Sequence, residues 1–178
     1  MCLGSRSVLD WYLMIRVGIL TVSDKGSRGE RQDTTHQAIR ELLAGETFEV
    51  AAYELVPDEA AQIRRVLRLW ADRDGLDLIL TNGGTGLSPR DQTPDATLEM
   101  IDKLAPGLSE LMRREGSKKN PLAALSRGVA GLRGKTLIVN LPGSPAGARE
   151  SLEAVLPVLP HAVEIASGRP VAGRRLHE

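Results

Sequence analysis

Short apolar runs and amphipathic stretches alternate along the chain. Short apolar runs rich in β-branched residues are typical of strands buried on both faces of a parallel sheet. Such runs occupy residues 15–22 (IRVGILTV), 47–56, 76–81 (LDLILT) and 135–141 (KTLIVNL). Apolar positions at helical spacing predict amphipathic helices between them. These helices are expected over residues 34–44, 58–72, 94–114, 120–127 and 145–166, and the third is interrupted at Pro106-Gly107.

The order of these elements predicts an α/β protein. Strands that alternate with helices usually form a mostly parallel central sheet with helices on both faces. The carboxyl ends of parallel strands meet at one edge of such a sheet, and ligands bind in the loops there. We therefore expect the functional residues in four loops, which cover residues 23–31, 56–59, 82–95 and 141–147.

Composition and charge narrow the range of partners. The formal net charge of the 178 residues is +0 and aromatic residues make up 3%, so neither a basic face nor stacking platforms for nucleic acid are expected. No apolar run is long enough to span a membrane. A single cysteine, Cys2, forms no internal disulfide, which fits a cytoplasmic location. Residues 1–14 are interpreted as a flexible N-terminal extension, with Met14 as an alternative start.

The segment after the third strand, residues 82–95 (N-G-G-T-G-L-S-P-R-D-Q-T-P-D), carries the most candidate chemistry. Gly83, Gly84 and Gly86 lack Cβ atoms, so the backbone can turn tightly and present N–H groups to an anion, while Thr85 adds a hydroxyl. This composition suits a phosphate, although a simple glycine turn explains it equally well. The Lys and Ser/Thr of a Walker A loop are absent, and so is the third glycine of the dinucleotide fingerprint.

Two aspartates near strand ends are candidate metal ligands. Asp91 is a hard oxygen ligand that suits Mg²⁺, and Arg90 could neutralise phosphate charge, although an exposed ion pair between these neighbours is the commoner outcome. Asp58 follows Pro57 at the expected start of a helix, where local sequence favours a capping role. It is also placed to share a metal with Asp91, as nucleotidyl transfer requires.

Two helix starts carry polar side chains that have a structural explanation. Thr93 followed by Pro94 predicts a capping residue and the first helical residue, with Asp95 at the positive end of the helix dipole. Ser144 followed by Pro145 predicts the same arrangement at the last helix. Because helix N-termini attract anions, this second turn is also a candidate phosphate site.

The remaining polar groups say little one at a time. The segment Ser23-Asp24-Lys25-Gly26 after the first strand is explained by a solvated turn. The three histidines, His36, His161 and His177, are scattered without the spacing of metal ligands.

The loops taken together are far more specific. T-V-S-D-K-G, V-P-D-E, T-N-G-G-T-G-L-S-P-R-D-Q-T-P-D-A-T and N-L-P-G-S-P follow one another in this order within one domain. In this combination the chain closely resembles the bacterial molybdopterin adenylyltransferase family, over residues 15–168. The resemblance implies a three-layer α/β/α sandwich with a mostly parallel central sheet, usually assembled as a homotrimer. Residues 169–178 would then be a C-terminal tail.

The resemblance also implies a reaction and a site. The reaction is the Mg-ATP-dependent adenylylation of molybdopterin, with ATP as co-substrate and pyrophosphate released. The family's two functionally important aspartates match Asp58 and Asp91, which would be catalytic and would hold Mg²⁺. The substrate- and phosphate-binding residues would be Gly83, Gly84, Thr85, Gly86, Arg90, Ser23, Asp24, Pro142, Gly143 and Ser144. A molybdenum-insertion protein is the expected downstream partner.

Two other functions stay open. A molybdopterin-binding or delivery protein of the same superfamily, without catalysis, would have the same loops, although T-P-D-A-T and N-L-P-G-S-P favour the adenylyltransferase branch. A nucleotide-dependent oxidoreductase on a similar sheet is disfavoured by the missing fingerprint glycine.

Overall fold

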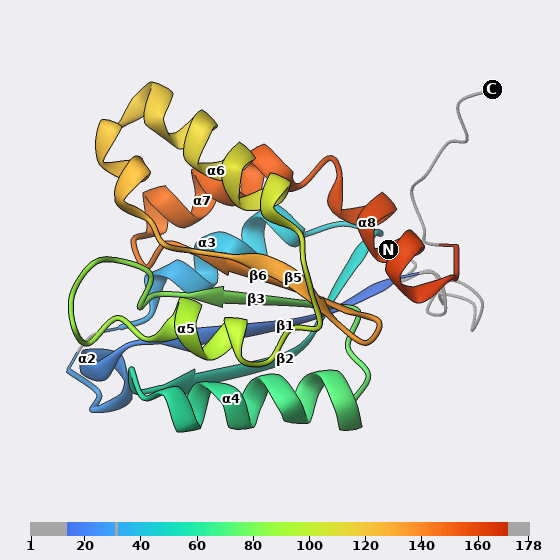
Figure 1. The fold of residues 1–178 in the computed structure, drawn as a ribbon, viewed down its shortest axis with the longest axis horizontal. Coiled ribbons are helices and arrows are strands. Elements are labelled where there is room, and N and C mark those ends of the chain that lie inside the picture. The colour runs from blue at the N-terminus through green and yellow to red at the C-terminus, as the bar shows by residue number, and fades with distance from the viewer. Residues whose placement is uncertain (1–13, 31, 171–178) are drawn as a thin grey trace, which may run out of the picture.

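A computed structural model describes residues 14–30 and 32–170. Its centre is a six-stranded sheet with the strand order β2-β1-β3-β6-β5-β4 (Figure 1). The strands are β1 (Ile15–Val22), β2 (Phe48–Val56), β3 (Leu78–Asn82), β4 (Lys103–Leu104), β5 (Ala130–Arg133) and β6 (Thr136–Leu141). β2, β1, β3 and β6 pair in parallel, whereas β5 and β4 continue the sheet in antiparallel pairing.

Helices cover both faces of this sheet. The α-helices are α2 (Asp24–Ser27), α3 (Thr34–Leu43), α4 (Ala60–Arg68), α5 (Thr93–Leu98), α6 (Pro106–Lys119), α7 (Pro145–Val155) and α8 (Leu159–Ser167). α3, α6, α7 and α8 lie on one face, and α4 and α5 lie on the other (Figure 1). The predicted three-layer α/β/α sandwich with a mostly parallel sheet is therefore confirmed.

The core forms two layers because strand side chains alternate between the faces. Ile15, Val17 and Ile19 of β1 belong to the cluster under α3, α7 and α8, whereas Leu20 and Val22 belong to the cluster under α4. All five are buried. Burial of such side chains is worth roughly 1.5–3 kcal/mol each, which fixes the central strands and hence the loops that follow them.

The four predicted strands are found, with small shifts at their ends, but other elements differ from the prediction. The short strands β4 and β5 at the antiparallel edge were not predicted. The last helix is divided into α7 and α8 around Pro157, because proline has no N–H to donate and clashes with the preceding turn. The helix expected over residues 120–127 is instead a 3₁₀-helix, η2 (Pro121–Leu125), capped by Asn120 through the Leu122 N–H at 3.0 Å.

The parallel strands end at one edge of the sheet. In the paired registers Val22 lies beside Val56, Thr21 beside Asn82, and Asn82 beside Leu141. The loops that follow the four strands therefore open on the same side, as the sequence predicted. This edge holds the candidate site.

Both predicted terminal segments fall largely outside the described residues. The N-terminal extension, with Cys2, does so apart from Met14, and the C-terminal tail does so apart from Arg169 and Pro170. Within the described part of the chain, no helix combines the length and the apolar character needed to cross a membrane.

Candidate functional site

A cavity of about 350 Å³ lies where β1, β2, β3 and β6 end. We call it the carboxylate cavity because four aspartates, Asp24, Asp33, Asp58 and Asp91, line it. The predicted site residues in its lining are Ser23, Asp24, Asp58, Gly83, Gly84, Arg90, Asp91, Gly143 and Ser144. The cavity thus joins all four of the loops that the sequence singled out.

Asp24 ties two of these loops together. Its Oδ1 accepts the backbone N–H of Asp58 at 3.0 Å, and its Oδ2 accepts Nη2 and Nε of Arg90 at 2.7 and 3.2 Å. The hydrogen bond from Arg90, followed by that from the Asp58 N–H, lowers the pKa of Asp24. Ser23 fixes the start of α2 by accepting the Gly26 N–H at 3.0 Å. The expected solvated turn is therefore a helical turn with its acidic residue in the cavity wall.

Asp58 is buried, with 8% of its surface exposed. Its Oδ1 accepts the Gln92 N–H at 3.0 Å, while the N-cap residue of α4 is Glu59 and makes no side-chain capping bond. The capping role that local sequence favoured is therefore wrong. Burial raises the pKa of Asp58, the Gln92 N–H opposes that rise, and the charges of Asp91 and Asp24 add to it. An ionised carboxylate in these surroundings is stabilised by a bound cation.

Residues 83–86, which we call the glycine loop, lie close to neighbouring atoms, and they can do so only because the glycines have no Cβ atoms. Gly83 has φ +97°, and a Cβ there would lie 2.1 Å from the Val22 carbonyl oxygen. Gly84 has φ +60°, and its Cβ would lie 2.5 Å from both Oδ2 of Asp58 and Oγ1 of Thr93. The first glycine holds the loop against β1, and the second leaves a cradle beside the buried carboxylate.

Asp91 is positioned by its own turn. Its Oδ2 accepts the Ser88 N–H at 2.9 Å, and its N–H donates to the Ser88 carbonyl at 2.9 Å. A Cβ at Gly86 would lie 2.8 Å from Oδ2 of Asp91, so this carboxylate also packs against a glycine. Arg90 pairs with Asp24 and not with its neighbour, so the expected exposed pair between residues 90 and 91 is wrong.

Thr93 is completely buried and lies inside α5. The N-cap of α5 is Gln92, which makes no side-chain capping bond, so the predicted cap at Thr93 is wrong. Among the residues that the structure describes, its Oγ1 has no hydrogen-bond partner. An unpaired buried hydroxyl costs roughly 1–3 kcal/mol. Because this oxygen faces the cradle at Gly84, a polar ligand atom bound there would offset that cost.

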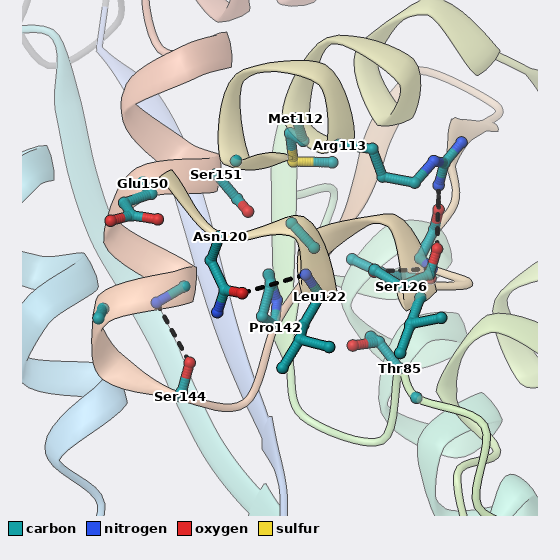
Figure 2. Close-up of a pocket in the computed structure, with 18 of the residues that line it drawn as sticks. Thr85, Met112, Arg113, Asn120, Leu122, Ser126, Pro142, Ser144, Glu150 and Ser151 are labelled. Carbon is teal, nitrogen blue, oxygen red and sulfur yellow. Dashed lines mark hydrogen bonds between the residues drawn. The ribbon is translucent and has the colours of Figure 1, made fainter. Parts of the chain in front are cut away.

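A second cavity, of about 420 Å³, shares Ser144 with the first, and Figure 2 shows its lining. Met112 and Arg113 of α6, Leu122 of η2, and Glu150 and Ser151 of α7 surround it. Its lining is more apolar than that of the carboxylate cavity. The predicted site residues that line it are Thr85, Gly86, Pro142 and Ser144. The glycine loop thus contributes to both cavities, and Ser144 lines both.

The loop after β6 is held from two sides. Ser144 caps α7 by accepting the Gly147 N–H at 3.2 Å, which confirms the predicted cap. Thr35 of α3 donates its hydroxyl to the Gly143 carbonyl at 2.9 Å. These bonds fix the boundary between the two cavities.

Sequence reasoning missed a polar network in the floor of the carboxylate cavity. The Thr21 hydroxyl donates to Oδ2 of Asp33 at 2.5 Å and accepts Nδ2 of Asn82 at 2.9 Å. Asp33 also accepts the Tyr53 hydroxyl at 2.9 Å and caps α3 through the His36 N–H. The signal was present, because Thr21 and Asn82 are polar residues at the ends of apolar strands.

Comparison with known proteins identifies the family. The family model described as "Probable molybdopterin binding domain" matches residues 18–161, and the chain belongs to this family. A molybdopterin adenylyltransferase of Helicobacter pylori (strain J99) is 43% identical over 156 residues, which cover 86% of this chain and 89% of that protein.

Two further similarities differ in how much of the other protein they cover. The molybdenum cofactor synthesis protein cinnamon of Drosophila melanogaster is 42% identical over 165 residues, which cover 92% of this chain but only 27% of that protein. The crystal structure of the molybdopterin biosynthesis enzyme MoaB of Thermus thermophilus is 76% identical with a TM-score of 0.85, covering 88% of this chain and 99% of that one.

Proposed function

We propose that this chain is a molybdopterin adenylyltransferase, which transfers the adenylyl group of ATP to molybdopterin in molybdenum cofactor biosynthesis. The observation that carries the proposal is the pair of adjoining cavities that share Ser144 and the glycine loop. Group transfer between two substrates requires adjoining sites, because their reacting phosphates must meet. Relatives with this name match the chain over most of its length.

Asp91 and Asp58 would hold Mg²⁺ in the carboxylate cavity. The raised pKa of buried Asp58 and the unpartnered Thr93 hydroxyl fit a cation site beside Gly84. Among residues 14–30 and 32–170, no group of three or more His, Cys, Asp or Glu residues could hold a metal ion. Mg²⁺ can be held by only one or two carboxylates, with phosphate oxygens and water completing its shell. When bound, it would shield the phosphate charge.

The reaction needs alignment more than acid–base catalysis. A terminal phosphate oxygen of molybdopterin forms a bond to the α-phosphorus of ATP, and the bond from that phosphorus to the bridging oxygen breaks, so that pyrophosphate leaves with the electron pair. Because the attacking oxygen is already anionic, no strong base is required. N–H groups of the glycine loop and the Thr85 hydroxyl would bind phosphate, and Arg90, held by Asp24, would neutralise its charge.

The test is a turnover assay with purified protein, molybdopterin, ATP and Mg²⁺, followed by pyrophosphate release and mass detection of the adenylylated pterin. We expect product only with Mg²⁺, and Asp91→Asn should lower kcat by about a hundredfold or more while molybdopterin still binds. Folded native protein that binds molybdopterin but forms no product would instead establish the non-catalytic binding or delivery function.

We further propose that the protein works in the cytoplasm as a homotrimer and passes its product to a molybdenum-insertion protein. The family resemblance supports this assembly. Light scattering of the purified protein should then give three times the 19.2 kDa mass of the chain. A monomer mass at the same concentration would contradict it.

A further inference from the structure

Arg127 makes an unusual set of contacts with the glycine loop and the segment that follows it. It lies between η2 and β5. Its Nε donates to the Gly86 carbonyl at 2.9 Å, and its Nη2 donates to the Asp91 carbonyl at 2.6 Å. Its backbone N–H donates to the Thr85 carbonyl at 2.8 Å. One residue from a distant part of the chain therefore holds both ends of residues 86–91.

The guanidinium itself is oriented by a carboxylate. Asp95 in the first turn of α5 accepts Nη1 at 3.1 Å and Nη2 at 2.9 Å. An arginine presents its donors in a rigid planar fork, so a two-pronged bond to a carboxylate fixes the plane of the remaining donors. The pair thus aims Arg127 at the two loop carbonyls.

The held segment has little packing of its own. Leu87 is 65% exposed, and Ser88, Pro89 and Arg90 are exposed as well. Segments with few buried contacts and exposed hydrogen bonds open at low free-energy cost. The position of Asp91, at the end of this segment, therefore depends on the bonds that close it.

We propose that Arg127 is a positioning residue, which clamps residues 86–91 so that Asp91 and Arg90 are presented to the carboxylate cavity in a fixed geometry. This inference rests on the proposed function. Arg127 is not among the residues that line either cavity. It therefore acts through the loop and not on the substrates.

Arg133 provides a matched control. It makes a two-pronged pair with Asp72 at 2.8 and 2.6 Å and donates to the Met100 carbonyl at 2.9 Å. Its chemistry therefore repeats that of Arg127, but it lines neither cavity and touches no residue of the glycine loop. Arg133→Gln removes an equivalent arginine network without disturbing the segment 86–91.

The first experiment compares kinetics of Arg127→Gln, Arg127→Lys and Arg133→Gln. A misplacement of about 1 Å can lower a rate about a hundredfold. We expect Arg127→Gln to lower kcat by about that factor and to raise the half-saturating Mg²⁺ concentration about tenfold, with the KM for molybdopterin within about threefold of native. Arg127→Lys, which keeps the charge without the fork, should recover only part of kcat. Arg133→Gln should leave all three parameters within about twofold.

The second experiment measures amide hydrogen exchange without any substrate. The N–H groups of Ser88 and Asp91 are bonded within the clamped segment, so both should exchange at least about tenfold faster in Arg127→Gln than in Arg133→Gln. Equal exchange in the two variants, or equal kinetics, would overturn the clamp. Faster exchange together with a native protein that forms no adenylylated product would keep the clamp and refute the proposed function instead.

Discussion

Replacement of Gly84 by alanine would put a methyl group into the cradle beside the buried carboxylate. The added Cβ would lie 2.5 Å from Oδ2 of Asp58 and from Oγ1 of Thr93, about 1 Å closer than an ordinary contact. The backbone of Gly84 also has φ +60°. Gly75 has the same φ, but nothing lies within 4 Å of a Cβ built there. Gly75→Ala therefore carries the backbone strain without the collision.

The two costs can be separated by magnitude. A left-handed backbone costs a residue with a Cβ roughly 1–2 kcal/mol, which is the loss in unfolding free energy expected for Gly75→Ala. Overpacking adds roughly 1–3 kcal/mol, so Gly84→Ala should lose roughly 2–5 kcal/mol. Relief of the collision moves Asp58 by about 1 Å, and a shift of that size lowers turnover about a hundredfold. Gly75→Ala should keep its turnover.

Urea unfolding gives the free energies, and pyrophosphate release at saturating substrates gives kcat. In thermal unfolding, each kcal/mol of lost stability should lower the midpoint temperature by roughly 2–4 °C for a chain of this size. Equal stability losses in the two variants would refute the collision argument. Native kcat in Gly84→Ala would refute the placement of Asp58 at the reacting phosphates.

Two further predictions concern single side chains. Because the pKa of Asp58 is raised in the folded protein, its stabilising contribution is complete below the unfolded-state pKa near 3.8 and is lost as pH rises through the folded-state pKa. Asp58→Asn should therefore unfold at a higher temperature than the native protein near neutral pH, and this difference should close in acid. A variant less stable than the native protein at neutral pH would contradict this. Ser144→Ala removes the hydrogen bond from the Gly147 N–H and should lower the free energy of urea unfolding by about 1 kcal/mol, whereas Ser144→Thr keeps the cap. Identical losses of unfolding free energy in both variants would show that the cap contributes nothing.

The central strands could be predicted from the sequence because their burial is recorded in the pattern itself. The run over residues 15–22 matches β1 (Ile15–Val22) at both ends. By contrast, β4 (Lys103–Leu104) consists of two exposed residues that pair with β5 at the edge of the sheet, and no apolar pattern marks such a strand. The division between α7 and α8 could have been predicted, since Pro157 cannot continue a helix.

The candidate site was predicted at the level of loops and not of contacts. The neighbours of Asp58 in the sequence predict that it caps a helix, yet its carboxylate accepts a hydrogen bond from the N–H of Gln92, which lies 34 positions away. Thr93 looks like a cap but is enclosed beside the same carboxylate. Arg127 had no local signal, because its partners belong to another loop. Such roles arise only when the sheet brings distant loops together.

The first and last described segments meet at the edge of the sheet opposite the cavities. Arg169 pairs with Asp77, whose Oδ2 also accepts the Arg16 N–H at 2.8 Å, and Arg169 donates to the Met14 carbonyl at 3.4 Å. Adjacent ends far from a site let a domain be spliced into a longer polypeptide without blocking access to its ligands. The same architecture can therefore serve as a free-standing chain or as one module among several, as the much longer fly relative illustrates.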